Sequence, residues 1–332
     1  TIAATSIPER VTPEVLGAVG FAEIDLGLGP TEEWVRPPVD AFGIDEAWSG
    51  GVTSVLTRHR TDPLDRWRDD PEPALRRVLP VAATGTAPVE PARVDVTLRL
   101  HQRAPDDVLH ELVGLDRESG RWAVASDRLV GSWTAWGQSA VDGDPSTAWR
   151  SPFGRATGHR LDVRHGAPRV DRFRLRQPEG GSMITRLRLV ADGRRVEVDV
   201  PAPDADGWSE IVLPRPLTGP ELRLVVTEVE EVTTVDPRYG EITVLPSGIA
   251  ELDIPDAEAP ATRATRVAAT CRSDLLALDG EPRPLSFDVS AEELLTGAPV
   301  TATPCDPVEP VGEELRVAGT PGVRTGLSLI HI

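Results

Sequence analysis

Two acids and a tryptophan stand close together in segment 140–149, which reads Ala-Val-Asp-Gly-Asp-Pro-Ser-Thr-Ala-Trp. Asp142 and Asp144 can each accept hydrogen bonds from their own turn, and Gly143 between them can adopt a positive φ angle. Carboxylate oxygens gathered this closely also suit calcium, which prefers hard oxygen ligands. An Asp-x-Asp pair occurs in nucleotide-sugar transferases too, but that motif needs an α/β sheet, and no such sheet is indicated here. The segment therefore predicts a tight acidic turn with donors for a metal ion.

The order of these residues resembles the signature loop of discoidin-like modules, the galactose-binding β-sandwiches of the coagulation factor type C kind. A repeat supports this resemblance, because Gly20–Leu26 recurs in character as Gly248–Ile254. In discoidin-like modules such a segment resembles the closing strand, whose glutamate lies near the loop. The resemblance implies a structural calcium ion, with the expected ligands Asp142, Asp144, Thr147 and Glu251. A plain hydrogen-bonded turn explains the same residues equally well, so both alternatives remain open.

Three residues beside this loop are candidates for glycan binding, namely Trp133, Trp136 and Arg150. Aromatic faces can stack on a sugar ring, and a guanidinium can donate to hydroxyls. The alternative for both tryptophans is packing in a core or between domains, which is the commoner role of large aromatic side chains. Trp149 is expected in the core of the sandwich.

The composition excludes several classes of protein. The net charge is -18, and all 35 basic residues are arginines because lysine is absent. Such a chain lacks the basic footprint that phosphate binding requires, so nucleic acid is not an expected partner. With 32 prolines and 29 glycines, short strands and turns are favoured over long helices. No apolar run in this sequence reaches the roughly 18–20 residues of a transmembrane helix.

The chain has two cysteines, Cys271 and Cys305, and neither belongs to a Cys-x-x-Cys motif. The six histidines are scattered without the spacing of metal ligands, so a zinc site is not expected. In an exported protein the two cysteines predict one disulfide, and two buried free thiols are the alternative.

Alternating apolar residues predict an all-β fold with little helix. The clearest signal is Asp192-Gly193, which stands between two alternating runs and predicts a hairpin. Proline followed by acids after Ala104 predicts one short helix, and the capping box Ser290–Glu293 predicts another. Five segments are expected in all: the C-terminal end of a truncated discoidin-like module (1–26), a β-rich intermediate domain (27–120), a discoidin-like jelly-roll β-sandwich (121–258), a small β-rich domain with a disulfide (259–326) and a tail that resembles a translated sequencing adapter (327–332).

Several short motifs together resemble one family: Gly20–Ile24, Arg58–Pro63, Glu72–Arg77, Cys271–Leu276 with Asp279-Gly280, and Cys305. They are similar to the large extracytoplasmic region of actinobacterial membrane arabinofuranosyltransferases of the α-(1→3) type. The absence of lysine and asparagine agrees with a GC-rich actinobacterial genome. The resemblance implies a piece of a membrane protein at the extracytoplasmic face of the plasma membrane. In that family a transmembrane catalytic region adds arabinofuranose from a polyprenyl-phosphate donor to cell-wall arabinan.

Two functions follow from the resemblance, and both are non-catalytic. The first is an accessory module that binds a cell-wall polysaccharide, arabinan or arabinogalactan, beside the transmembrane catalytic region of the same parent chain. The second is a structural scaffold that binds no glycan. A free-standing enzyme is not indicated, because the sequence has no Gly-x-Ser-x-Gly elbow, phosphate loop or dinucleotide fingerprint. Exposed aromatic residues at the end of the sandwich would favour binding, and buried ones would favour the scaffold.

Overall fold

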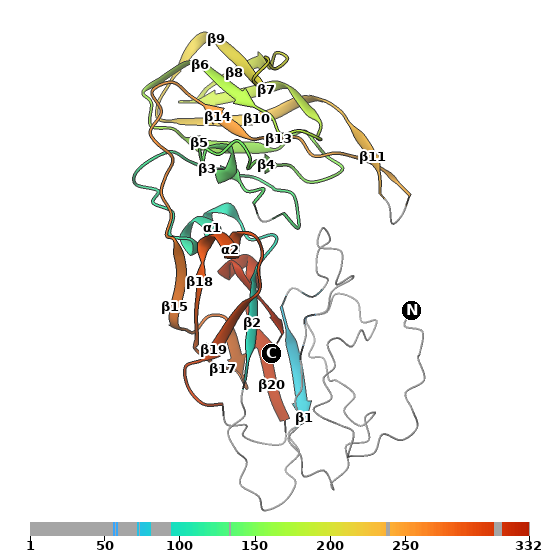
Figure 1. The fold of residues 1–332 in the computed structure, drawn as a ribbon, viewed down its shortest axis with the longest axis vertical. Coiled ribbons are helices and arrows are strands. Elements are labelled where there is room, and N and C mark those ends of the chain that lie inside the picture. The colour runs from blue at the N-terminus through green and yellow to red at the C-terminus, as the bar shows by residue number, and fades with distance from the viewer. Residues whose placement is uncertain are drawn as a thin grey trace, which may run out of the picture.

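The computed structural model describes positions 56, 58, 72, 74–80, 94–132, 134–236, 240–308 and 314–331 of the chain. The expectation for segment 1–26, including the first copy of the repeat, and that for Trp133 lie outside the described residues. The described residues form two modules, one above the other in Figure 1, and each has its own hydrophobic core. The expected all-β class with little helix is confirmed.

The upper module is a β-sandwich of antiparallel strands. One sheet has five strands in the order β3-β5-β10-β7-β8, and the facing sheet has three in the order β14-β6-β9. Their bounds are β3 Trp122–Ala125, β5 Arg160–Arg164, β6 Arg169–Arg176, β7 Met183–Ala191, β8 Arg194–Asp199, β9 Trp208–Thr218, β10 Glu221–Glu230 and β14 Glu251–Asp253. Short pairs complete the module: β4 Trp149–Arg150 with β13 Gly248–Ile249, and β11 Thr233–Val235 with β12 Ile242–Val244. A 3-10 helix, η2, spans Gly137–Ala140.

Local sequence explains why these strands form. In β6, Phe173 and Leu175 point into the core and are at most 1% exposed, while the neighbouring Arg172 and Arg174 face outward. Asp192 and Gly193 both have positive φ angles, 45° and 72°, and connect β7 to β8 as a two-residue turn. Such a turn matches the twist of the two strands, so the expected hairpin is present.

The lower module consists of two further sheets. One has five strands in the order β15-β18-β19-β2-β21, and the other has four in the order β1-β20-β16-β17. The bounds of the strands are β1 Arg76–Pro80, β2 Val96–Leu100, β15 Arg266–Arg272, β16 Leu276–Leu278, β17 Glu281–Pro282, β18 Leu285–Ser290, β19 Val300–Pro304, β20 Glu314–Gly319 and β21 Leu327–His331. Three short helices accompany them in the described chain: α1 Asp106–Leu112, α2 Ala291–Leu295 and α3 Gly322–Thr325. A disulfide joins Cys271 to Cys305, whose Cα atoms lie 5.7 Å apart.

The division of the lower module differs from the expected one. Segments 27–120 and 259–326 were expected as separate domains, yet β2 lies between β19 and β21, and β1 pairs with β20. Their apolar side chains share one core. The sandwich is therefore inserted into the lower module between α1 and β15. The expected division into consecutive segments does not contain this insertion, because the strand pairing joins residues on either side of it.

The two connections to the sandwich run side by side. Arg121 and Pro260 form a parallel β-bridge. The Arg121 amide donates to the Ala259 carbonyl at 2.8 Å, and the Ala261 amide donates to the Arg121 carbonyl at 2.9 Å. A Cβ on Gly120 would lie 2.8 Å from the Ala259 oxygen, so only glycine fits this close approach. We call this paired segment the neck.

The last strand takes part in the core. Leu327 and Leu329 of β21 are 1% and 3% exposed, and the strand pairs with β2. Segment 327–332, which was expected to stand apart from the fold, therefore supplies described residues to it. The pairing with β2 describes how this segment folds in the structure.

Replacing Leu329 with alanine is expected to lower the free energy of unfolding by about 2–4 kcal/mol, because it leaves a cavity beside β2. Urea denaturation followed by circular dichroism measures this change. Val323→Ala on α3 is the control, since that side chain is 42% exposed and its truncation should have little effect. Equal midpoints for the two variants would show that β21 does not pack as described.

None of the helices among the described residues has both the length and the apolar character needed to span a bilayer.

Candidate functional site

The signature loop connects η2 to β4 and is anchored by Trp149. This tryptophan is fully buried in the sandwich core, and its indole nitrogen donates to the Asp127 carbonyl at 2.9 Å. The η2 helix before the loop and the β4–β13 pair after it place both ends of the loop against the core. Trp149 therefore has the position in the core that the sequence predicts.

The acids of the loop bind donors of the loop itself. Asp142 accepts from the Asp144 amide and from the Thr147 hydroxyl, both at 2.9 Å. Asp144 accepts from the amide of Ser146 at 2.9 Å and from its hydroxyl at 2.6 Å. Gly143 has a φ angle of 84°, which the turn requires and which glycine adopts without strain. The arrangement is a hydrogen-bonded turn closed by its own side chains.

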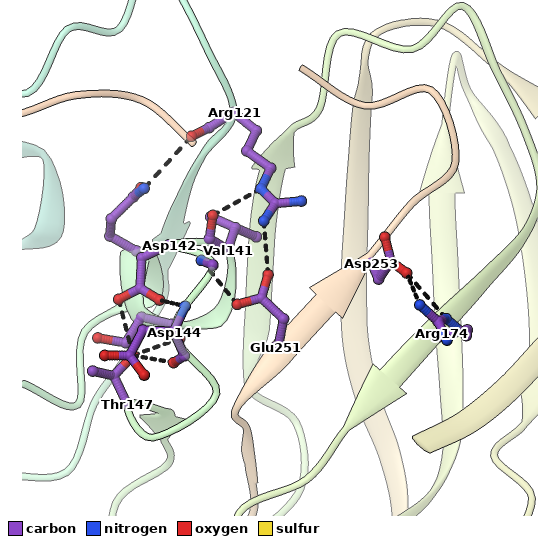
Figure 2. A network of polar contacts seen from close by, with 11 residues as sticks. Arg121, Val141, Asp142, Asp144, Thr147, Arg174, Glu251 and Asp253 are labelled. Atoms are coloured by element: carbon purple, nitrogen blue, oxygen red, sulfur yellow. Dashed lines mark hydrogen bonds and ion pairs between the residues drawn. The ribbon is translucent and has the colours of Figure 1, made fainter. Parts of the chain in front are cut away.

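Glu251 lies beside this loop, as the repeat and the resemblance imply (Figure 2). One carboxylate oxygen accepts from Arg121 Nη2 and the other from the Gly143 amide, each at 2.9 Å. Arg121 also donates from Nε to the Val141 carbonyl at 2.9 Å. Arg121 thus connects β14, the neck and the signature loop through one guanidinium.

The electrostatics of Glu251 reflect its burial. The side chain loses water on folding, which raises the pKa of its carboxyl to about 7, although Arg121 and the Gly143 amide act in the opposite direction. Burial likewise raises the pKa of Asp142 above its usual range. Asp144 is different, because hydrogen bonds from Ser146 lower its pKa. The nearby donors thus only partly offset the loss of water at Glu251.

The expected calcium ligands do not fit a metal site in this arrangement. Asp142, Asp144, Thr147 and Glu251 are near one another, but both oxygens of Glu251 already accept from protein donors. Nowhere in the described chain do three or more His, Cys, Asp or Glu residues form a group that could hold a metal ion. The guanidinium of Arg121 takes the position opposite Glu251 in which a cation would compensate the carboxylate. The residues favour the hydrogen-bonded turn of the two alternatives.

We therefore expect calcium at millimolar concentration to leave the melting temperature of the protein unchanged. Differential scanning calorimetry with and without calcium, and with magnesium as the control, measures this. A rise specific to calcium would contradict the hydrogen-bonded turn.

The two described glycan-binding candidates, Trp136 and Arg150, are not gathered at one surface. Trp136 is 2% exposed and belongs to the core of the lower module, where its ring meets His110 edge-on with centroids 5.5 Å apart. Of the two alternatives for Trp136, the structure therefore favours packing in a core over glycan binding, because its faces are covered by protein. Arg150 on β4 is half-buried and donates from Nη2 to the Glu179 carbonyl at 3.2 Å, and burial lowers its pKa. Trp133 lies outside the described residues.

A buried ion pair at the junction of the two modules could not be predicted from the sequence. Asp106 at the start of α1 is 4% exposed and accepts from the amides of Ala125 at 2.9 Å and Gly137 at 2.7 Å. Its other oxygen lies 3.5 Å from Nη1 of Arg128. Arg128 Nη2 donates to the carbonyls of His101 and Gln102, each at 3.2 Å. Thus a residue of the lower module holds two backbone segments of the sandwich.

Burial governs the charges of this pair. It raises the pKa of Asp106, against the opposing influence of Arg128 and the two amides, and it lowers the pKa of Arg128. A Cβ on Gly137 would lie 2.8 Å from the Asp106 carboxylate and 2.7 Å from the Ala125 nitrogen, so glycine is required there. In the sequence, Asp106 looked like an ordinary acid in the first turn of a helix, and no local signal distinguished it.

The described fold is similar to that of a mycobacterial arabinofuranosyltransferase. The cryo-EM structure of arabinofuranosyltransferase AftD from Mycobacteria matches 78% of this chain at 22% identity with a TM-score of 0.51. A mutant of the same protein matches the same share at 23% identity, also with a TM-score of 0.51. This chain spans about a fifth of the length of those proteins, 20% and 21% respectively. At such identities the likeness establishes the fold alone.

A smaller match comes from a carbohydrate-binding module. The family 32 module of NanJ from C. perfringens, solved in complex with galactose, matches 48% of this chain and 98% of its own at 15% identity, with a TM-score of 0.30. No family model matches the chain. No curated protein matches it either.

The pH dependence of stability should reveal the burial of Glu251. Between its ordinary pKa of 4.5 and about 7, the folded protein holds a proton that the unfolded chain has released. The contribution of Glu251 to stability is therefore largest below pH 4.5 and is lost as the pH rises through 7. Relative to Glu251→Gln, the wild type should lose on the order of 1–3 kcal/mol of unfolding free energy between pH 4.5 and 8.

Urea denaturation at a series of pH values gives this difference. The control is Glu230→Gln, a change at an exposed position of β10, which should leave the pH profile of the wild type unaltered. Parallel profiles for the wild type and Glu251→Gln would contradict the raised pKa.

Proposed function

We propose that this chain is a non-catalytic accessory region of a membrane arabinofuranosyltransferase, placed at the extracytoplasmic face of the plasma membrane. The likeness in fold to AftD over 78% of the chain supports this parent. The disulfide between Cys271 and Cys305 supports an oxidising compartment. The partner is then the transmembrane catalytic region of the same parent chain, which adds arabinofuranose from a polyprenyl-phosphate donor to cell-wall arabinan.

The role we propose within that parent is to hold the sandwich in a fixed orientation on the lower module. One observation carries this proposal: Asp106 of the lower module binds two backbone amides of the sandwich and the buried Arg128. The hydrogen-bonded neck adds a second restraint. Two modules that are joined by one flexible linker would have neither contact. The paired contacts suit a rigid scaffold.

Glycan binding at the signature loop is the weaker candidate. It was expected to use two tryptophans and Arg150, and Trp136 is now part of the core of the lower module. The calcium ion that would brace the loop does not fit the donors around Glu251. Binding of arabinan or arabinogalactan by this chain therefore needs another surface.

Distance measurements between the two modules test the scaffold role. Val212 on β9 is 69% exposed and Val323 on α3 is 42% exposed, so each can be replaced by cysteine and spin-labelled. The described cysteines are both in the disulfide and leave no other thiol to label. A narrow distance distribution by pulsed electron spin resonance is expected, and Asp106→Ala should broaden it. A distribution as broad in the wild type as in Asp106→Ala would refute a rigid junction.

Activity assays test the non-catalytic assignment. The purified chain, incubated with polyprenyl-phosphate arabinose and an arabinan acceptor, is expected to transfer no sugar. Transfer that is retained after repurification would show that the chain is itself an enzyme and would overturn this part of the proposal.

A further inference from the structure

The outer face of the three-stranded sheet β14-β6-β9 carries an unusual set of side chains. The strand register places Asp253 opposite Arg174, and Arg174 opposite Glu210. The neighbouring positions along β6 and β9 are Arg172 and Trp208. We call these five residues, Arg172, Arg174, Trp208, Glu210 and Asp253, the sheet-face site. All five belong to strands, so the sheet sets the positions of their backbones relative to one another.

The ion pair at the centre of this site leaves one hydrogen-bond acceptor and one donor without a partner among the described residues. Arg174 donates from both Nε, at 3.0 Å, and Nη2, at 2.5 Å, to the same oxygen of Asp253 (Figure 2). The other carboxylate oxygen of Asp253 and Nη1 of Arg174 have no partner among the described residues. The pair thus presents an acceptor next to a donor. A sugar hydroxyl, which both donates and accepts, complements such a pair.

The flanking residues add to this capacity. Neither Arg172 nor Glu210 makes a side-chain hydrogen bond or close ion pair with any described residue, although the Glu210 carboxylate lies near enough to Arg174 to help raise the pKa of that guanidinium. The opposite face of the sandwich is different, because Arg186, Arg188 and Arg223 are each paired with carboxylates there. Those three arginines are neutralised by carboxylates, whereas part of the charge at the sheet-face site remains available to a ligand.

An aromatic ring and a groove complete the site. The guanidinium carbon of Arg174 lies 4.9 Å from the centroid of the Trp208 ring, and Trp208 itself is half-buried. A groove of about 190 Å³ lies beside Arg174, lined by Arg172, Phe173, Arg174, Glu210, Asp253 and Pro255. This volume is below the roughly 300–1,000 Å³ of pockets that enclose a drug-sized ligand. It suits one ring of a longer chain that lies across the surface.

We propose that the sheet-face site binds a neutral glycan. One sugar ring would occupy the groove, with its hydroxyls on Asp253, Arg174, Arg172 and Glu210, and a neighbouring ring would lie against Trp208. The charge balance decides the ligand class, since two guanidiniums and two carboxylates favour a neutral polyol over a polyanion that the carboxylates would repel. The site does not depend on the scaffold role. It borders the signature loop on one side, since Asp253 lies two positions from Glu251 on β14 and helps to raise the pKa of that carboxyl.

Titration calorimetry of the full chain with soluble arabinan and arabinogalactan oligosaccharides tests the proposal. The wild type is expected to bind at least one of them, and Trp208→Ala and the double variant Arg172→Ala/Asp253→Asn should each weaken the association constant at least tenfold. Arg188→Ala on the opposite face is the matched control and should bind as the wild type does. Circular dichroism and melting temperature establish that each variant is folded, and the double variant retains Trp208 in case its removal disturbs β9.

Three outcomes would overturn the proposal. The first is that the wild type shows no measurable heat of binding with either glycan at millimolar concentration. The second is equal affinity of the wild type, Trp208→Ala and the double variant. The third is loss of binding in Arg150→Ala together with unchanged binding in Trp208→Ala, which would place the glycan at the signature loop instead.

Discussion

Replacing Asp106 with alanine is expected to lower the free energy of unfolding by about 3–5 kcal/mol, the range for removing one partner of a buried ion pair. Arg128, 7% exposed, would keep its buried charge without a carboxylate. The amides of Ala125 and Gly137 would lose their acceptor, and unsatisfied buried donors are costly. Urea denaturation of the full chain, read out by far-ultraviolet circular dichroism, measures the loss.

Two further variants make the result for Asp106 specific. Asp107→Ala removes the neighbouring exposed acid of the same helix turn and should change stability little. Asp106→Asn retains an acceptor for the amides but loses the charge opposite Arg128, so its effect should lie between the other two. Equal stabilities for Asp106→Ala and Asp107→Ala would show that the junction is not held by this carboxylate.

Removing the disulfide is expected to have an effect of similar size. The bridge joins Cys271 of β15 to Cys305 directly after β19, across 34 positions of sequence. By the chain-entropy account, a loop of this length is stabilised by about 3–4 kcal/mol through restriction of the unfolded chain. The double variant Cys271→Ser/Cys305→Ser should therefore melt at a distinctly lower temperature than the oxidised wild type.

Reduction provides an independent check of the same bridge. Dithiothreitol should lower the melting temperature of the wild type to near that of the double serine variant, and it should leave the variant unchanged. A wild type that melts equally with and without reductant would show that the bridge contributes no stability.

Local patterns predicted the strands better than they predicted the modules. The alternation around Phe173 and the Asp192-Gly193 turn depend on neighbouring residues, and these features fold as the sequence indicates. The pairing of β2 with β19 and β21 joins residues that are far apart in the chain, and no periodicity within either strand records its partner. The expected boundary near residue 120 is a real passage between modules, but the chain returns to the first module after it.

In the candidate site, too, contacts between neighbouring residues could be predicted from the sequence and contacts between distant residues could not. The Asp142–Thr147 turn could be predicted because these residues bind one another, and the repeat predicted that Glu251 lies next to them. The role of Arg121 could not, since the guanidinium reaches the loop from the neck, 130 positions from Glu251. The choice between the two alternatives for Trp136 could not be made from the sequence for a related reason, because the surface that covers it belongs to the other module.

The insertion of the sandwich also has a consequence for the order of synthesis. Strand β2 ends at Leu100, while its partners β19 and β21 begin at Val300 and Leu327. At about 5–20 residues per second, the ribosome needs on the order of 10–40 s to make the intervening chain. During that interval the sandwich can be completed, whereas β2 has neither hydrogen-bonding partner and its apolar face stays exposed. The lower module, although its first strands emerge before the sandwich, is therefore the last to fold, and a chaperone would meet it with β2 still unpaired.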